Sequence, residues 1–281
     1  MIKFLVDSGS DYDVKEAEEK GIYFAPLSVT FGEETFQDGI ELGRKEFYDR
    51  LVHQDQFPKT AQPSPETFLK FFNEAKENGD EVIGVCMSSE ISGTYQSANI
   101  AKEMCEYDGI YLIDSLTAIY CVKMMVDFGI QLRDEGKTAK EIVEEITALK
   151  GKMNVILAVD TLDNLYKGGR LTKMEAGIGN LAKLKPIISI PEGKVIMLKK
   201  CIGRKKAMAG VIELFKQIDL DERFPVYAMY SYDVTNMETM IEKFAEQGII
   251  IDKSYEIGPT IGTHVGAGSF GVVCVGKRNY E

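Results

Sequence analysis

Apolar and polar positions alternate in blocks along the first half of the chain. Three continuous apolar runs have the length of buried parallel strands, namely Ile2–Val6, Val82–Cys86 and Ile110–Ile113. Helical spacing of apolar residues is found between and after these runs, in Pro65–Asn78, Thr94–Glu106, Ala118–Glu135 and a segment that ends near Lys150. This alternation predicts a mostly parallel sheet covered by helices.

Two of these helices carry clear start signals. Ser64 precedes Pro65, as expected for an N-cap followed by a proline at the first helical position. The tetrapeptide Thr138-Ala-Lys-Glu141 has the capping-box pattern and opens the helix that ends near Lys150.

The pattern changes after Gly151. The segment Pro186–Leu198 predicts two strands joined by a tight Pro-Glu-Gly turn. Further strands are expected at Val155–Val159, Val226–Tyr230, near Ile249–Ile251 and at Val272–Val275, with helices at Arg204–Ile218 and Met237–Gln247. A hairpin inserted among alternating strands and helices predicts a sheet with both parallel and antiparallel strands. We therefore expect two α/β domains, residues 1–151 and 152–281, with a ligand cleft between them.

Composition narrows the class of protein. The chain has 281 residues, and none of its apolar runs is long enough to span a bilayer. The first residues follow a strand pattern and not that of a secretory signal. The five cysteines are dispersed without a C-x-x-C pair, which is typical of reduced thiols in a cytosolic protein. These features lead us to expect a cytoplasmic location and no stable membrane insertion. With two histidines and dispersed cysteines, we also expect no metal site.

Charge is unevenly distributed. The net charge of −11 argues against general affinity for nucleic acid. The basic segment, residues 183–206, nevertheless holds eight Lys and Arg residues against the single acid Glu192, so it carries about +7 and the remainder about −18. This segment is either a solvated basic face or a docking surface for an acidic partner or a phosphate.

A glycine-rich segment near the C-terminus contains one of the two histidines. Ile257–Gly271 holds five glycines and His264. Glycine lets the backbone approach a ligand closely, and the imidazole can offer a ring N–H to it. Gly266–Gly271 matches the dinucleotide pattern G-x-G-x-x-G, but a β-branched run follows where that pattern requires a helix. We expect a loop at the rim of a ligand site, and no dinucleotide site.

Polar turns follow the three predicted strands of the first half, at residues 7–10, 88–92 and 114–115. Ligands of open parallel sheets bind beyond these carboxyl ends. The turn from Ser88 to Ser92, with Gly93, leads directly into a helix, whose free N–H groups suit an anion. Each serine is also an ordinary candidate for helix capping. Asp7 and Asp114 would repel an anion, so we expect them to organise the loops by accepting local backbone hydrogen bonds.

Three other polar residues are less distinctive. Thr60 lies in a proline-pinned loop, residues 58–65, that otherwise predicts only a loop and a helix cap. Arg170 follows two glycines on a flexible turn, where surface exposure is the default. His53 belongs to a polar helical stretch and is expected to be solvated.

A serine hydrolase is one alternative function, with His264 as the base and Ser92 or Ser115 as the nucleophile. The chain has no G-x-S-x-G elbow, and spacing alone identifies no orienting acid. A kinase is a weaker alternative, because the phosphate loop and the metal-binding signature are missing.

Taken together, several motifs resemble the DegV family across essentially the whole chain, in order. They are Asp7-Ser8, Thr60-Ala-Gln-Pro-Ser-Pro65, Ser88-Ser-Glu-Ile-Ser-Gly-Thr-Tyr-Gln-Ser-Ala98, Lys167-Gly-Gly-Arg170, Lys205-Lys-Ala207 and Ile257-Gly-Pro-Thr-Ile-Gly-Thr-His264. The resemblance implies a two-domain bacterial protein that buries one long-chain fatty acid between its domains. It also implies a partner, the catalytic subunit of a fatty acid kinase, which uses ATP to convert the presented carboxylate to acyl phosphate for phospholipid synthesis.

The resemblance also implies roles for particular residues. Thr60, Ser92 and His264 match the positions that hold the carboxylate, and Arg170 matches the arginine of the family's Gly-Gly-Arg turn. The family usually has serine where this chain has Ala61, and often arginine where it has Ile202. We therefore expect a non-catalytic carrier without a cofactor. The alternatives are a lipid hydrolase or acyl-transfer enzyme with a Ser92–His264 pair, and a lipid sensor or storage protein without a kinase partner.

Overall fold

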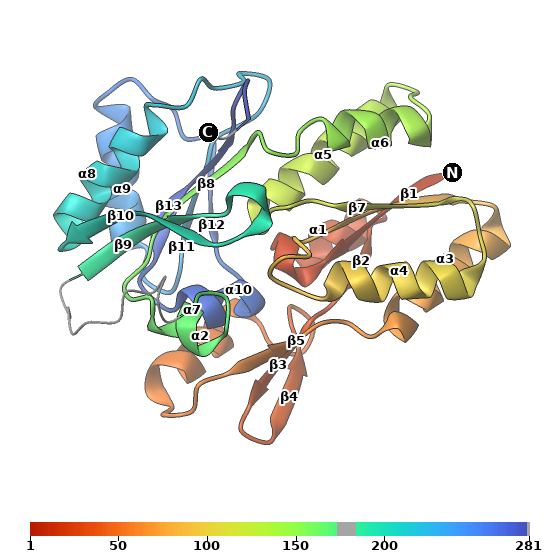
Figure 1. Ribbon diagram of the computed structural model, residues 1–281, viewed down its shortest axis with the longest axis horizontal. Helices are drawn as coiled ribbons and strands as arrows, with labels where there is room; N and C mark the ends of the chain where they lie inside the picture. The colour runs from red at the N-terminus through yellow and green to blue at the C-terminus, as the bar shows by residue number, and fades with distance from the viewer. Residues whose placement is uncertain (173–183, 280–281) are drawn as a thin grey trace.

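The computed structural model describes residues 1–172 and 184–279 of the chain. Two β-sheets with flanking helices lie side by side, one built from the first half of the chain and one from the second (Figure 1). The prediction of an α/β fold with a parallel N-terminal sheet and a mixed C-terminal sheet is confirmed.

The N-terminal sheet has four parallel strands in the order β2-β1-β6-β7. Its strands are β1 (Ile2–Asp7), β2 (Tyr23–Ala25), β6 (Glu81–Cys86) and β7 (Ile110–Asp114). Helices α3 (Pro65–Asn78) and α4 (Thr94–Cys105) pack on the face that contains Leu5. The opposite face contains Phe4 and Val6 and is covered by α1 (Val14–Glu19), α5 (Tyr120–Asp134) and α6 (Ala139–Thr147). Alternate residues of β1 therefore pack against the helices on opposite faces of the sheet.

Start signals in the sequence correspond to the observed helix ends. Ser64 caps α3 by accepting a hydrogen bond from the Thr67 amide, with Pro65 at the first position. Thr138 and Glu141 form the reciprocal capping box of α6. These local interactions satisfy amide groups that have no partner within the helix.

The C-terminal sheet is mixed and six-stranded, in the order β10-β9-β8-β13-β11-β12. Its strands are β8 (Met153–Ala158), β9 (Leu184–Ser189), β10 (Ile196–Ile202), β11 (Tyr227–Tyr230), β12 (Lys253–Glu256) and β13 (Phe270–Val275). Among the described strands of this sheet, only β11 and β12 pair in parallel. Helices α8 (Arg204–Phe215) and α9 (Thr235–Ala245) cover one face. The predicted hairpin is present, with a 3-10 turn at Pro191–Gly193 between β9 and β10.

Several elements differ from the sequence predictions. The prediction of a strand near Ile249–Ile251 is wrong. The strand is β12 (Lys253–Glu256), and Ile250 is an exposed residue of the segment before it. A small antiparallel sheet, in the order β4-β3-β5, was not predicted. It comprises β3 (Ser28–Phe31), β4 (Glu34–Gln37) and β5 (Lys59–Ala61), with α2 (Arg44–His53) nearby. β3 and β4 form a hairpin across Gly32 and Glu33, whereas β5 pairs with β3 from a distant part of the chain. Strands of three or four residues leave little local pattern.

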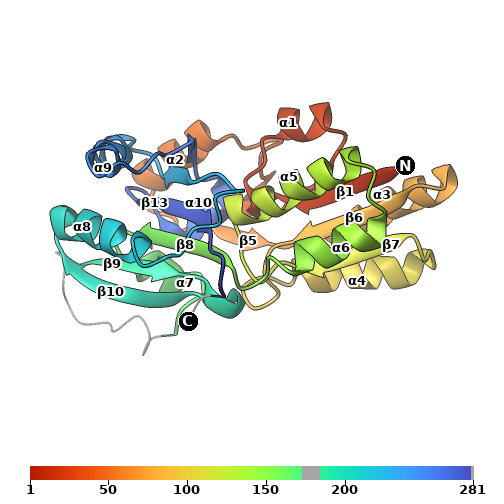
Figure 2. The ribbon, with the colours of Figure 1, turned by 90° about the horizontal axis from the view of Figure 1, so that it is seen from above.

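The main hydrophobic core connects the two halves. One cluster of buried side chains includes Phe4 and Val6 of the parallel sheet together with Val155 and Leu157 of the mixed sheet. Helix α5 starts between the two sheets in both views (Figures 1 and 2). The switch from one sheet to the other occurs between α6 and β8, around Gly151. The division into domains 1–151 and 152–281 stays a prediction.

Candidate functional site

A cavity of about 350 Å³ lies between elements of the two halves. This volume is within the range of small-molecule sites, roughly 300–1,000 Å³. Most of its wall is apolar, including Leu27, Met87, Ile119, Val155, Leu157 and Ile188. Polar side chains also reach the wall, namely Thr60, Gln62, Ser92, Arg170, Thr260 and His264. An apolar cavity with a few polar groups in its wall suits an amphipathic molecule with one polar group.

His264 lies on a helix, which corrects the prediction of a glycine-rich loop over Ile257–Gly271. Helix α10 (Pro259–Val265) begins with Gly258 as the N-cap and a proline at its first position, and it ends at Gly266 with φ 73°. A Cβ atom at Gly262 would lie 2.7 Å from the Phe47 and Tyr48 rings. The glycine therefore serves close packing within a helix.

The His264 imidazole is neutral and only partly bonded. Its Nε2 atom lies 3.0 Å from Thr60 Oγ1, while the buried Nδ1 atom has no hydrogen-bond partner. Burial, with a smaller contribution from the Arg170 charge, lowers the pKa of His264 to about 3. Gly168 makes room for this ring, because a Cβ atom there would lie 2.2 Å from Nδ1. At neutral pH, His264 therefore offers a hydrogen bond without a positive charge.

Thr60 reaches the cavity from a strand, and not from the plain loop that was expected. It lies on β5 and pairs with Val29 of β3. The strand register holds its hydroxyl against His264, which is 204 residues away in sequence. Local sequence could not indicate this placement, because it depends on a sheet whose strands are three or four residues long.

Ser92 lies at the start of α4, as the predicted anion-binding turn requires. Its hydroxyl pairs with Thr94 Oγ1 at 2.8 Å. Gly93 is the N-cap residue, and α4 has neither a side-chain cap bond nor an acidic residue in its first turn. Gly93 itself is not among the wall residues, but a Cβ atom there would collide with the Gln62 side chain. The Thr94 amide donates to Ser92 Oγ at 3.3 Å, and no carboxylate in the first turn opposes the positive end of the α4 dipole.

Arg170 contributes the only guanidinium among the described wall residues. The side chain is half-buried, and it donates hydrogen bonds to the Ile91 and Gly168 carbonyl groups. These bonds connect the turn around Gly168 and Arg170, in the C-terminal half, to the loop before α4. Helix α7 (Asp163–Lys167) precedes the turn and packs against α10. The expectation of simple surface exposure is thus corrected by tertiary contacts.

Ser88 is not brought to the cavity wall. It is fully buried, and its hydroxyl donates to the Gly193 carbonyl group at 2.9 Å. The two aspartates act as loop organisers, as predicted. Asp7 accepts hydrogen bonds from the Gly9 and Met87 amides, and Asp114 accepts from the Ser89 and Leu116 amides. His53 is exposed at the end of α2, also as predicted.

The geometry does not form the pair that the hydrolase alternative requires. Ser92 bonds with Thr94, and His264 bonds with Thr60. Within the described part of the chain, His264 Nδ1 has no carboxylate partner to orient the ring. A serine nucleophile needs both contacts for activation.

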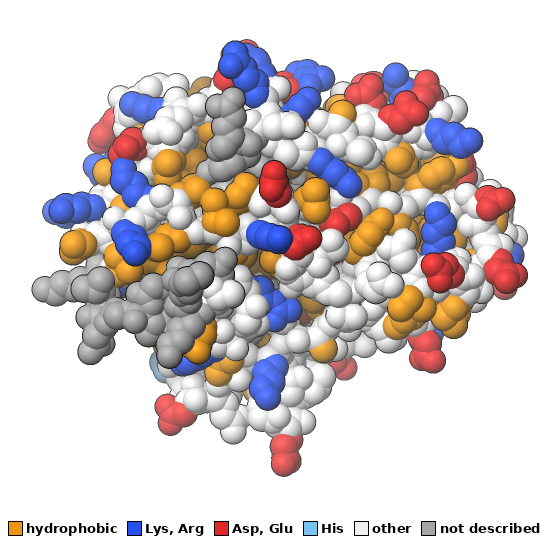
Figure 3. All heavy atoms as spheres, viewed as in Figure 1, with side chains coloured by type: hydrophobic (Ala, Val, Ile, Leu, Met, Phe, Trp, Pro, Cys, Tyr) orange, Lys and Arg blue, Asp and Glu red, His pale blue; other side chains and the backbone are white. Residues whose placement is uncertain are grey.

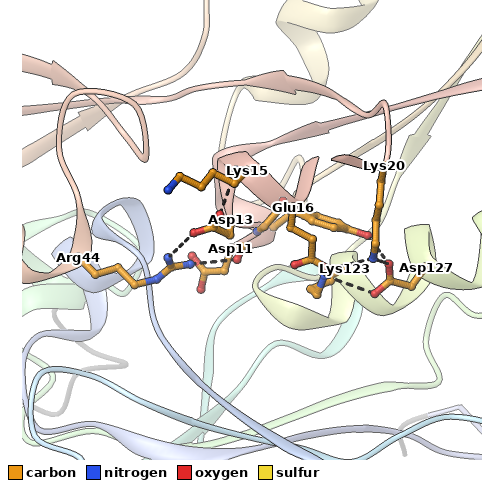
Figure 4. Close-up of polar contacts among 10 residues, drawn as sticks. Asp11, Asp13, Lys15, Glu16, Lys20, Arg44, Lys123 and Asp127 are labelled. Atoms are coloured by element: carbon orange, nitrogen blue, oxygen red, sulfur yellow. Dashed lines mark hydrogen bonds and ion pairs between the residues drawn. The ribbon is translucent and has the colours of Figure 1, made fainter. Parts of the chain in front are cut away.

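Sequence analysis missed a buried charged cluster at the opposite end of α10. Asp38 accepts hydrogen bonds from the amide and hydroxyl of Thr260, and Asp11 accepts one from the Gly258 amide. Arg44 donates to the Asp11 and Glu256 carbonyl oxygens and faces the Asp11 side chain (Figure 4). Burial raises the pKa of Asp11 to about 8, against the lowering effect of Arg44. The cluster fixes the segment that leads into α10.

A second ionic cluster lies beside it, between α1 and α5 (Figure 4). The buried Lys123 amine contacts Glu16 and Asp127 and stacks over the Tyr12 ring. Lys20 pairs with the same two acids. These residues are not among those lining the cavity. The arrangement joins two helices and is structural.

Much of the charge in the basic segment is paired. Lys185 contacts Asp160, Lys194 contacts Glu90, and Lys199 contacts Glu213. Lys183 lies outside the described residues. On the face shown in Figure 3, Lys and Arg side chains are frequent over α8 and β10, whereas acidic side chains gather over α3, α4 and α6. The segment is therefore a basic surface with fewer unpaired charges than its sequence suggests.

Two kinds of feature are absent from residues 1–172 and 184–279. These residues contain no group of three or more His, Cys, Asp or Glu side chains that could hold a metal ion. They also contain no helix that combines the length and hydrophobicity needed to cross a bilayer.

Comparisons with known proteins cover the full length of the chain. The family model described as "Uncharacterised protein, DegV family" matches residues 1–277. A DegV domain-containing protein of Halalkalibacterium halodurans is 35% identical over 276 residues, which are 96% of this chain and 97% of the relative. A solved DegV family protein from Thermus thermophilus, described as fatty acid binding, has a TM-score of 0.88 at 28% identity and covers 98% and 99% of the two chains. A stearic acid-binding protein from Eubacterium ventriosum has a TM-score of 0.88 at 27% identity, with 99% of each chain covered.

Proposed function

This chain belongs to the DegV family, and from that premise we propose that it binds one long-chain fatty acid and presents the carboxylate to a separate fatty acid kinase. The kinase would then use ATP to form acyl phosphate. The observation that carries the proposal is the mostly apolar cavity with polar side chains of both halves in its wall. The fatty-acid-binding relatives share the fold over nearly the whole chain.

The hydrocarbon tail supplies most of the affinity in this proposal. Each buried methylene contributes about 0.8 kcal/mol, so roughly fifteen of them contribute on the order of 12 kcal/mol before the entropy costs of binding. The apolar wall, with residues such as Leu157 and Ile188, suits such a tail. The two proposed domains, residues 1–151 and 152–281, would enclose it from opposite sides.

The carboxylate is assigned to Thr60, Ser92 and His264. A buried carboxylate is costly unless its oxygens accept hydrogen bonds. Two hydroxyls and a neutral imidazole can donate them, and the start of α4, which has no acidic residue in its first turn, adds a favourable dipole. Arg170 lines the same cavity and supplies a positive charge. These groups fix the orientation of the fatty acid more than the strength of its binding.

The first experiment identifies the ligand of the purified protein. We expect denaturation, extraction and mass spectrometry to yield about one free fatty acid per chain. Addition of a fatty acid kinase and ATP should then produce acyl phosphate. Turnover of an ester substrate by the protein alone would favour the hydrolase alternative, whereas retention without phosphorylation would favour storage or sensing.

A second experiment tests whether the tail provides the affinity and the carboxylate contacts provide the orientation needed for transfer. We expect Ser92→Ala and His264→Ala to reduce kinase-coupled transfer about tenfold or more, with a smaller effect on retention of the fatty acid. Transfer kinetics and ligand content are measured on the same preparations. Ser89→Ala is a matched control, because Ser89 is exposed and bonds to Asp114. Equal loss of transfer and retention would contradict the proposal.

The basic surface is the proposed docking surface for the kinase. Arg204, Lys205 and Lys206 are all exposed at the start of α8, whose first turn contains no acidic residue, and Arg204 lies 3.7 Å from the Asp160 carboxylate. Reversal of these three charges should raise the apparent KM for the carrier, and the effect should shrink as salt is added. Unchanged kinetics at low salt would remove this surface from the proposal.

A further inference from the structure

The most exposed part of the cavity wall lies beside its polar groups. Among the described wall residues, only Ala61 and Gln62 are classed as exposed, and they come directly after Thr60 at the end of β5. A kinase that acts on the carboxylate therefore has its shortest route to it at this edge of the wall. Of these two exposed residues, only Gln62 has a side chain that both donates and accepts hydrogen bonds.

The backbone around Gln62 is fixed on both sides. Before it, Ala61 pairs with Ser28 of β3. After it, the buried Pro63 restricts the preceding residue to extended conformations, and Ser64 caps α3. The direction in which the Gln62 side chain leaves the backbone is therefore set by a strand, a proline and a helix cap.

The Gln62 side chain connects β5 to α4. Its Nε2 atom donates a hydrogen bond to Ser97 Oγ at 3.1 Å. The same side chain lies across the start of the helix, because a Cβ atom at Gly93 would lie 2.1 Å from Gln62 Oε1. Within the described chain, this is the only side-chain hydrogen bond between the end of β5 and α4. Ser97 is buried and does not line the cavity.

This bond joins the two elements that supply the hydroxyl groups of the proposed carboxylate site. Thr60 lies two residues before Gln62, and Ser92 directly precedes Gly93, the N-cap residue of α4. Both hydroxyls can donate to one carboxylate only if their separation suits its two oxygen atoms, since hydrogen bonds weaken steeply with poor distance or angle. The bond from Gln62 to Ser97 fixes that separation.

We propose that Gln62 is a positioning residue that holds Thr60 and Ser92 at the separation one carboxylate requires. Through this role it makes the cavity select fatty acids over neutral lipids with the same tail. The inference rests on the proposed function, because it concerns the same site. Gln62 acts through its bond to Ser97 and needs no contact with the ligand. Its neutral amide also places no negative charge beside the carboxylate or the phosphate groups of an approaching nucleotide.

Two variants break the bond from opposite ends. Gln62→Met keeps the length of the side chain and removes its amide, whereas Ser97→Ala removes the acceptor at a position outside the cavity wall. A saturated fatty acid and the alcohol of the same chain length compete for each protein, and mass spectrometry of the bound fraction gives the preference. Each variant should lower the preference for the acid about three- to tenfold. The double variant should lower it no further than the stronger single variant, because both break the same bond.

The same variants have a distinct signature in the kinase assay. The kcat of transfer should fall by a similar factor in Gln62→Met and Ser97→Ala, while the apparent KM for the carrier stays the same. This split is expected because the bond affects how the bound carboxylate is held and not the docking surface.

Two controls accompany these variants. Gln96→Met makes the same substitution at an exposed residue in the first turn of α4 that does not line the cavity, and it should leave the preference unchanged. Ile188→Ala shortens an apolar wall residue and should weaken acid and alcohol equally. Because only folded protein binds either lipid, the preference does not depend on how much of a variant is folded.

The outcomes are distinct. If Gln62→Met lowers the preference but Ser97→Ala does not, or if the two effects add, Gln62 contacts the ligand itself and the positioning role is wrong. If the wild-type protein prefers the acid and both variants keep that preference, the positioning role fails while the proposed function stands. If the wild-type protein binds neither lipid, the proposed function fails and the role of Gln62 fails with it.

Discussion

The two ends of helix α10 are both polar and buried, but their groups are used differently. At the N-terminal end, Asp11 and Asp38 accept hydrogen bonds from Gly258 and Thr260, and Arg44 bridges the neighbouring carbonyl groups. At the C-terminal end, His264 has one partner, and its other ring nitrogen has none. The first set is mostly satisfied by the protein itself, whereas the second retains capacity for a ligand.

This difference separates support from binding. The charged cluster holds α10 against the N-terminal half and so fixes where His264 lies. The charges are tolerated because each faces amides or an opposite charge, although burial still raises the pKa values of the aspartates. The neutral cluster at the other end can accept a carboxylate without displacing a native ion pair. Three substitutions test this contrast, from the largest expected effect to the smallest.

The largest effect is expected for Asp38→Ala. It leaves the Thr260 amide buried without its acceptor, and we expect a loss of about 2–3 kcal/mol in the free energy of unfolding. The Asp38→Asn control keeps an acceptor oxygen and should lose less than half of this. Both are measured by urea denaturation. If His264→Ala proved more destabilising than Asp38→Ala, the contrast between a supporting end and a binding end would be lost.

A smaller effect is expected for Gly168→Ala. The added methyl group would overlap the His264 ring, so the ring must move and lose its hydrogen bond to Thr60. We expect a loss of about 1–2 kcal/mol in stability and a clear loss of kinase-coupled transfer. Gly43→Ala is the matched control, because a Cβ atom at Gly43 has open space around it. Normal transfer by G168A would show that the position of the ring is not critical.

The smallest effect is expected from Asp11→Asn, and it depends on pH. The pKa of Asp11 rises from 3.8 in the unfolded chain to about 8 in the folded protein. The native state therefore binds more protons between these values, and this group's contribution to stability falls as pH rises from 4 to 8. The amide variant should lack that fall, so its stability relative to the wild type should increase steadily from pH 5 to pH 9. The melting temperatures of both proteins are measured from pH 5 to pH 9. The same pH dependence in both would contradict this prediction.

Periodicity determined the elements whose stabilising interactions are local. Ser64 and Pro65 specified the start of α3, and Thr138 with Glu141 specified the start of α6. The apolar runs of β1, β6 and β7 were recognised because strands buried on both faces leave continuous apolar sequence. Motif resemblance, and not periodicity, selected Thr60, Ser92 and His264 as a set.

Tertiary structure alone decided the rest. Thr60 meets His264 because β5 pairs with β3, and α10 can lie close to α2 because Gly262 has no side chain that would collide with Phe47 and Tyr48. The conformation of Ile119 follows from a bond to Gly9, 110 residues earlier. Sequence patterns record which face of an element is apolar, since that repeats every few residues. They do not indicate which distant group completes a hydrogen bond, because a single long-range contact produces no repeating pattern in the sequence.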